Sequence, residues 1–207
     1  MARSAQCYLF SLAGRGGHRK LTPEIGAFGT VRFPEIYGRS RASYSQRLRG
    51  EIAAVFGVAL VHFACGAWYG EWPEFEKIAG RAWFGLNPGP GKQQHDPYGV
   101  FRVELVKPEH PVVRGMTDFD TQDELYTCLA GDHPVEIVAQ AKSKVDGKYY
   151  PIALVSHYGK GRTFHCVLGH DVKALSVPGV QELYRRGCAW AAGLAPVAAQ
   201  AAQPTNK

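Results

Sequence analysis

One continuous apolar segment, residues 57–64 (GVALVHFA), dominates the hydrophobic pattern of the chain. Its length suits a strand, and its lack of polar alternation is typical of a strand buried on both faces of a parallel sheet. Residues 71–80 combine Pro73 near the start, acidic residues in the first turn and Gly80 at the end. That combination predicts a short helix directly after the buried strand.

The second half of the chain predicts further strands and a closing helix. Residues 101–106 alternate apolar and polar side chains, which is typical of a half-buried strand. Residues 178–192 place apolar side chains on one face at a helical period, and Gly193 follows them, so an amphipathic helix is predicted. Four other apolar segments are strand candidates: residues 125–129, 135–139, 152–158 and 163–168. This order predicts an α/β fold with a partly antiparallel edge.

The chain of 207 residues is long enough to bury one sizeable core, and residues 51–193 are predicted to form a single α/β domain. Residues 1–50 hold an apolar patch at 7–12, a candidate first strand, but otherwise no sustained period, and we expect a divergent or poorly ordered segment. The tail 194–207 is rich in Ala, Gln and Pro and is predicted to be disordered. No apolar run approaches the roughly 20 residues that span a bilayer, so we expect no membrane segment and a cytoplasmic location.

The positive charge lies almost entirely in the first quarter of the chain. Residues 1–50 hold nine basic and two acidic residues, a net charge of +7, whereas the remainder holds 15 basic and 16 acidic residues. The body of the protein therefore lacks the basic surface of a nucleic-acid-binding domain. A basic arm remains an alternative, but it shows neither a recognition-helix pattern nor regularly interleaved aromatic residues. We do not expect nucleic acid as a partner.

The cysteine pattern excludes two common scaffolds. The number is odd and no C-x-x-C occurs, which argues against a disulfide framework and a zinc ribbon. Cys65, with Gly66, follows the buried strand directly, as the nucleophile of an elbow motif would, and His170 with Asp171 is a candidate base. The flanking pattern is incomplete, so a cysteine hydrolase is the weaker interpretation.

Three of the eight histidines lie at strand ends or in a loop, where the predicted fold brings them to one side of the sheet. His62 lies near the end of the apolar strand, His170 follows the candidate strand 163–168, and His95 lies in a Gly- and Pro-rich loop. Ligands of open α/β sheets bind outside the carboxyl ends of the strands, so the three imidazoles are predicted to face one crevice. Neutral imidazoles with a carboxylate also bind divalent metals, which makes the same three histidines candidate metal ligands. Each alone is more commonly a hydrogen-bonded structural residue.

A cluster of acids precedes residue 125: Asp118, Asp120, Asp123 and Glu124. Such a cluster supplies a general base or an acceptor for sugar hydroxyls, or it is a solvated loop.

Seven short strings, in order, resemble the trehalose-utilisation (ThuA-like) family, a branch of the class I glutamine amidotransferase-like fold. They cover residues 55–193 and are Leu60–Ala64, Trp72–Lys77, His95–Gly99, His110–Gly115, Asp123–Tyr126, Tyr158–Arg162 and Leu168–Asp171. The resemblance implies a flavodoxin-like three-layer sandwich with a mainly parallel sheet and an antiparallel edge. Residues 1–50 lack the helix and second strand usual in the family, so we expect the N-terminal part to be divergent or incomplete.

The resemblance also implies a function: acid–base processing of a disaccharide or keto-glycoside, with metal assistance left open. The implied catalytic residues are His62, His95, His170, Asp123, Glu124 and Asp171. Trp72 and Tyr98 are candidates for stacking on a sugar, with helix packing as the alternative for Trp72. The family is not known for an intact Cys-His-Glu triad, which weakens the Cys65 interpretation. A non-catalytic ligand-binding or assembly module is the alternative function, and self-association stays open.

Overall fold

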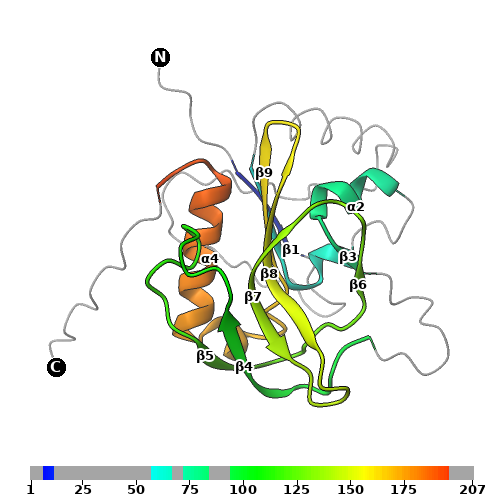
Figure 1. Ribbon diagram of the computed structural model, residues 1–207, viewed down its shortest axis with the longest axis vertical. Coiled ribbons are helices and arrows are strands. Elements are labelled where there is room, and N and C mark those ends of the chain that lie inside the picture. The colour runs from blue at the N-terminus through cyan, green and yellow to red at the C-terminus, as the bar shows by residue number, and fades with distance from the viewer. Residues whose placement is uncertain (1–6, 12–56, 67–71, 84–93, 196–207) are drawn as a thin grey trace, which may run out of the picture.

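The computed structural model describes residues 7–11, 57–66, 72–83 and 94–195, arranged around one large sheet (Figure 1). Its seven strands lie in the order β1-β2-β9-β8-β7-β4-β5. Their bounds are β1 (Cys7–Ser11), β2 (Gly57–Val61), β4 (Gly99–Leu105), β5 (Phe119–Asp123), β7 (Glu136–Lys142), β8 (Tyr149–Tyr158) and β9 (Gly161–Cys166). A separate two-stranded sheet pairs β3 (Ala82–Trp83) with β6 (Leu129–Ala130). The helices are η1, a 3-10 helix (His62–Gly66), α2 (Pro73–Ala79), α3 (Val172–Leu175) and α4 (Pro178–Ala191).

The large sheet is mixed rather than mainly parallel. Strands β1, β2 and β9 run parallel, whereas the pairs β9–β8, β8–β7, β7–β4 and β4–β5 are antiparallel. The predicted mainly parallel sheet is therefore wrong for the described strands. The physical reason lies in the connections: only Gly159 and Lys160 separate β8 from β9, and Gly159 has a φ of 59°. A two-residue turn of this kind joins antiparallel strands, because a parallel pair needs a long crossover.

Helices α2 and α4 cover opposite faces of β9, as their positions on either side of β8 and β9 in Figure 1 indicate. Toward α2, the Thr163 hydroxyl donates to the carbonyl of Ile78 at 2.8 Å. Toward α4, the ring of Phe164 lies so close to Gly187 that an added Cβ would come within 2.3 Å of it. The alternation of side chains along a strand accounts for this division: the buried β9 turns Thr163 and His165 toward α2 and Phe164 and Cys166 toward α4.

The hydrophobic pattern located most of these elements. The predicted strand 101–106 corresponds to β4, and the segments 135–139, 152–158 and 163–168 to β7, β8 and β9; the predicted helices correspond to α2 and α4. The apolar patch in residues 7–12 forms β1, beside β2. The predicted strand 125–129 is wrong, because the strand of this region, β5, ends at Asp123, two residues before it, and only Leu129 belongs to β6. The other predictions for residues 1–50, and almost all of those for 194–207, fall outside the described residues.

Among the described residues, no helix has the length and apolarity needed to cross a membrane.

Candidate functional site

His62 occupies a strained position where β2 ends and η1 begins. Its φ is 50°, and among the described residues it is the one non-glycine with positive φ. Its Nδ1 lies 2.8 Å from the carbonyl oxygen of Val167, and because a carbonyl only accepts, Nδ1 carries the proton. Its Nε2 therefore presents a lone pair to the site, where the hydroxyl of Tyr126 donates to it at 2.8 Å. The strand ends here because of this backbone turn, which explains why the apolar run 57–64 is only partly strand.

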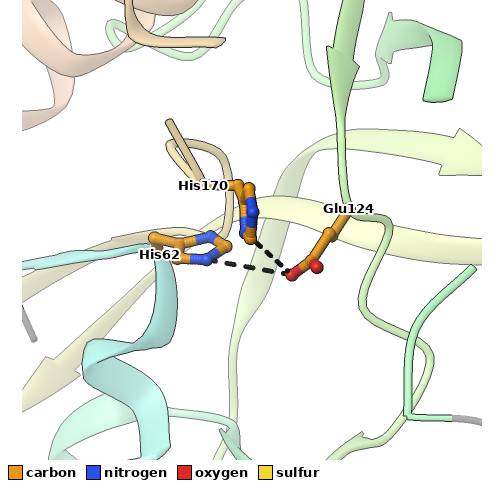
Figure 2. A group of neighbouring side chains, drawn as sticks. All are labelled: His62, Glu124 and His170. Atoms are coloured by element: carbon orange, nitrogen blue, oxygen red, sulfur yellow. Dashed lines mark ion pairs between the residues drawn. The ribbon is translucent and has the colours of Figure 1, made fainter. Parts of the chain in front are cut away.

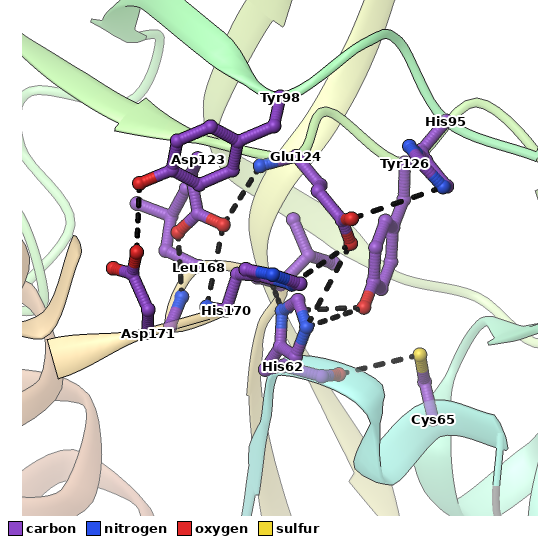
Figure 3. Close-up of polar contacts among 12 residues, drawn as sticks. His62, Cys65, His95, Tyr98, Asp123, Glu124, Tyr126, Leu168, His170 and Asp171 are labelled. Carbon is purple, nitrogen blue, oxygen red and sulfur yellow. Dashed lines mark hydrogen bonds and ion pairs between the residues drawn. The ribbon is translucent and has the colours of Figure 1, made fainter. Parts of the chain in front are cut away.

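Glu124 lies beside three imidazoles, of which Figure 2 shows His62 and His170 and Figure 3 shows His95 as well. Its Oε2 is 3.2 Å from Nδ1 of His170 and 4.0 Å from Nε2 of His62. Its Oε1 is 3.9 Å from Nε2 of His95. The side chain of Glu124 is only 17% exposed, whereas that of His170 is 44% exposed. The site is therefore a largely buried carboxylate that solvent reaches past His170.

Asp123 holds the turn that presents His170. This carboxylate is fully buried, and its Oδ2 accepts from the backbone N–H of Gly169 at 2.6 Å. Its Oδ1 accepts from the N–H groups of Glu124 at 2.8 Å and His170 at 3.3 Å. Burial raises the pKa of Asp123, and these backbone donors oppose that rise. With both oxygens engaged, Asp123 fixes the positions of its neighbours rather than facing a ligand.

Asp171 and Tyr98 form the exposed side of the site (Figure 3). One oxygen of Asp171 caps α3 by accepting from the N–H of Ala174 at 2.7 Å, and the other accepts from the Tyr98 hydroxyl at 2.9 Å. The rings of Tyr98 and His170 have centroids 5.5 Å apart. Because Tyr98 is 37% exposed, its ring offers an accessible aromatic surface beside the imidazole.

Two aromatic residues that the sequence reasoning did not select support His62 and His95. The rings of Trp83 and Tyr126 pack edge to face with centroids 4.6 Å apart, and Trp83 also lies 6.4 Å from His95. His95 pairs with Tyr126 through a β-bridge, and its Nδ1 lies 2.8 Å from the carbonyl of Asp96. Since Nδ1 faces that carbonyl, the other ring nitrogen, Nε2, is the one that faces Glu124. The sequence offered one indication for Tyr126, its position two residues after Glu124. It offered no indication for Trp83.

Burial sets the protonation states at the centre of the site. Burial lowers the pKa of His62, so its imidazole is neutral at pH 7. Burial also raises the pKa of Tyr126, so its hydroxyl keeps its proton and remains a donor. The site thus combines a neutral imidazole, a phenol and the Glu124 carboxylate, which are the groups that general acid–base catalysis uses.

The structure contradicts the cysteine-nucleophile interpretation. Cys65 lies inside η1 at 1% exposure, and its thiol donates to the carbonyl of His62 at 3.4 Å. Burial raises the pKa of this thiol, which disfavours the reactive thiolate. The sharp turn after the buried strand presents His62 instead. The elbow motif thus predicts the turn correctly, but the side chain that the turn presents to the site is that of His62, not Cys65.

Three further candidates lie outside the cluster. Trp72 stacks on Phe75 with ring centroids 6.1 Å apart and packs on the apolar residues beneath α2, which is the helix-packing alternative for this residue. Asp118 accepts from the backbone N–H of Leu105, and Asp120 pairs with Arg102 on the exposed surface of β4 and β5. The described contacts of all three are structural.

The protein is an α/β protein with a mixed sheet, and its histidines and a carboxylate lie together at the carboxyl ends of β2, β5 and β9. A family model described as trehalose utilisation (ThuA) matches residues 38–191, and the chain belongs to that family. The crystal structure of a ThuA-like protein from Parabacteroides merdae is 24% identical, with a TM-score of 0.70 over 86% of this chain and 82% of that one. A second, from Bacteroides uniformis, is 18% identical with a TM-score of 0.53 over 73% and 66%. At these identities both show a shared fold. No protein of curated function matches the sequence significantly.

Proposed function

We propose that this protein is a carbohydrate-processing enzyme of trehalose utilisation, which moves protons on a disaccharide that carries a ring carbonyl. The observation that carries the proposal is the position of Glu124, a largely buried carboxylate that three imidazoles surround, with Oε2 3.2 Å from His170. Membership of the trehalose-utilisation family supports a sugar as the substrate. A keto-glycoside suits this site better than an unmodified disaccharide because its carbonyl acidifies a neighbouring C–H group.

The proposed first step is removal of a proton from the carbon next to the carbonyl. Glu124 takes the proton, the C–H electron pair moves into the C–C bond, and the carbonyl oxygen becomes an enolate oxygen. A donor such as the Tyr126 hydroxyl stabilises that oxygen. The enolate then either regains a proton, which is isomerisation, or expels the glycosidic oxygen two carbons from the carbonyl, which is elimination. The proton that Glu124 has taken passes to the leaving oxygen, on the side of the site where His170 is exposed, so the elimination balances.

The other predicted residues take supporting roles in this proposal. Tyr98 offers its exposed ring to a sugar face, and Asp171 holds that ring through the 2.9 Å hydrogen bond to its hydroxyl. Asp123 positions His170 and Glu124 through their backbone N–H groups. His95 lies beside the other oxygen of Glu124, Oε1, at 3.9 Å.

We further propose the finer features that the family resemblance implies: flavodoxin-like layering of a glutamine amidotransferase-like fold, and a cytoplasmic location. The placement of α2 and α4 on opposite faces of β9 supports the layering. A small carbohydrate is the proposed partner, whereas nucleic acid is not. Self-association is a matter for measurement of the mass in solution.

A turnover assay separates the enzyme from its alternative, a non-catalytic ligand-binding module. Trehalose and its 3-keto derivative are incubated with the purified chain, and NMR follows the sugar signals. We expect loss of the keto sugar with the native protein and at least about a 100-fold slower loss with Glu124→Gln, which removes the base but keeps the shape. Glu109→Gln, at an exposed glutamate away from the site, is the matched control. Binding of the keto sugar without turnover would establish the binding module instead.

A further inference from the structure

We propose that His62, Glu124 and His170 bind a divalent transition-metal ion of the Zn²⁺ type. This inference deepens the proposed function and rests on it for its chemistry, but the ion's binding is measurable without any substrate. Each of the three side chains offers one ligand atom, and these atoms all lie within 4.8 Å of one another. Nε2 of His62 and Nδ1 of His170 are the nitrogens that approach Oε2 of Glu124. Two histidines and one glutamate are a donor set that catalytic zinc sites use.

The spacing of the three atoms suits a metal more than direct hydrogen bonds. With metal–nitrogen bonds of about 2.0–2.1 Å, the ligand atoms of a tetrahedral site lie about 3.3 Å apart. Oε2 of Glu124 is already 3.2 Å from His170, and it is 4.0 Å from His62. Closing the remaining gap requires small side-chain rotations at a site where His170 is partly exposed. The 4.0 Å separation is too long for a hydrogen bond.

The tautomer of His62 points its lone pair at the proposed ion. Because Nδ1 donates to the Val167 carbonyl at 2.8 Å, Nε2 faces the Glu124 carboxylate as an acceptor. Two acceptors that face one another are stabilised by a cation between them. Donation of the second ring nitrogen to a backbone carbonyl is also the usual way in which proteins orient a metal-bound histidine. The Asp123 contacts that fix the His170 backbone supply similar support for the other imidazole.

The charge of the site points the same way. Asp123 is fully buried and Glu124 is largely buried, and the ion pairs described for Glu124 are all with imidazoles. In the part of the chain that the structure describes, no lysine or arginine forms an ion pair with either carboxylate. A divalent cation would bring to these two carboxyl groups the positive charge that no described lysine or arginine supplies.

His95 does not belong to this ligand group, which revises the set that the sequence suggested. Its Nε2 lies beside the other oxygen of Glu124, at 3.9 Å, and outside the three-atom group. Three protein ligands leave coordination positions for the substrate. The carbonyl and adjacent hydroxyl oxygens of a keto sugar form a chelating pair of the correct kind, and a metal there polarises the carbonyl.

The test is a binding titration of the full chain after dialysis against EDTA. Calorimetry with Zn²⁺, and the visible absorption of Co²⁺ as a substitute, report stoichiometry and ligand geometry. We expect one ion per chain. We expect at least about 100-fold weaker binding in each of three variants: His62→Asn, Glu124→Gln and His170→Ala. Loss of a residue that only hydrogen-bonds to a metal ligand already costs up to about 100-fold, and loss of a ligand costs more. His95→Ala should change the affinity by less than about threefold, and thermal unfolding checks that every variant is folded.

One further variant separates a metal site from a hydrogen-bonded cluster. The Tyr126 hydroxyl donates to the same Nε2 that the ion would take, so Tyr126→Phe should bind Zn²⁺ at least as tightly as the native chain. A native chain that binds no ion would overturn the inference, as would binding that survives Glu124→Gln but not His95→Ala. Full turnover of a keto sugar in EDTA would also overturn it while leaving the proposed function intact. Binding of one ion without turnover would support the site and contradict the proposed function.

Discussion

At the scale of single residues, the site depends on a backbone conformation that His62 adopts at some cost. Left-handed φ values are unfavourable for residues with a Cβ and are tolerated best by Gly, Asn, Asp and, to a lesser degree, His. The surroundings hold His62 there through the Val167 carbonyl and the Tyr126 hydroxyl. A strained residue that two elements fix in place is typical of a functional site.

Two substitutions at His62 separate strain from chemistry. Asn accepts the φ of 50° more readily than Ala does, so His62→Asn should be more stable than His62→Ala by about 1 kcal/mol. Both variants lack the imidazole and should lose turnover to the same degree. Urea unfolding measures the difference in the free energy of unfolding. Equal stability of the two variants would show that the turn relaxes and that the strain is not intrinsic to the site.

The candidate site was only partly predictable at this scale. Residues His62 and His170 follow strands whose carboxyl ends meet, and this was visible in the apolar runs before them. Glu124 is one of four neighbouring acids, and the sequence alone did not show which of them faces the imidazoles. That choice depends on burial by β5 and on the turn at Gly169. Trp83 lies outside every motif, and its contact with Tyr126 is a product of tertiary packing alone.

At the scale of elements, the contact of α4 with β9 requires a glycine inside a helix. Gly187 is normally unfavourable there, since Gly costs about 1 kcal/mol relative to Ala in a helix interior. The buried ring of Phe164 occupies the space that a Cβ would need. Close packing of the helix on the sheet therefore outweighs helix propensity at this position.

A glycine-to-alanine change inside a helix usually increases the free energy of unfolding, but this contact should make it decrease. Gly187→Ala should destabilise the protein by about 1–3 kcal/mol, because the ring of Phe164 is enclosed in the core and cannot move aside without strain. Thermal or urea unfolding measures the effect, with Gly99→Ala as a contrast because the nearest atom to an added Cβ there lies at 3.6 Å, an ordinary contact, and the backbone is not left-handed. An unchanged or raised stability of Gly187→Ala would contradict the described packing.

Most elements follow from hydrophobic periodicity, but the pairing of strands does not. The apolar runs of β2, β8 and β9 and the amphipathic face of α4 are strong local signals. Strand β5, with the sequence FDTQD, reads as an acidic loop because an edge strand needs only its inward residues, Thr121 and Asp123, to be buried. Mainly parallel pairing was an inference from family resemblance, and the short β8–β9 turn was the local evidence against it.

At the scale of the whole molecule, curling of the sheet assembles the site. Strands β9 and β5 are separated by β8, β7 and β4, yet Asp123 at the end of β5 hydrogen-bonds to Gly169 after β9. Alternating strand directions make β2, β9 and β5 run the same way, so their carboxyl ends meet at one edge. The three elements that carry His62, His170 and Glu124 are thus brought together only by the complete fold.

The stability of the whole molecule should depend on pH through His165. Burial lowers the pKa of His165 to about 4, and its Nε2 has no hydrogen-bond partner among the described residues. In the unfolded chain His165 binds a proton near its ordinary pKa of about 6.5, whereas in the folded chain it stays neutral down to about pH 4. The free energy of unfolding is therefore unaffected by His165 above pH 6.5 and decreases as pH falls from 6.5 toward 4. The loss is on the order of 3 kcal/mol.

Urea unfolding between neutral and mildly acidic pH tests this dependence. His165→Leu removes the titrating group and should flatten the fall in the free energy of unfolding, whereas His157→Gln, at an exposed histidine, should leave it unchanged. An identical pH dependence in His165→Leu would mean that other groups cause the acid loss of stability.

Solvent deuterium exchange tests whether Glu124 and its imidazoles move protons on a keto sugar. The native chain and 3-keto-trehalose are mixed in D₂O, and NMR follows the hydrogens on the carbons next to the carbonyl. We expect the native chain to exchange or eliminate one of these hydrogens far faster than buffer does, and Glu124→Gln to reduce the rate by at least about 100-fold. Exchange at the buffer rate, or equal rates for the two proteins, would contradict it.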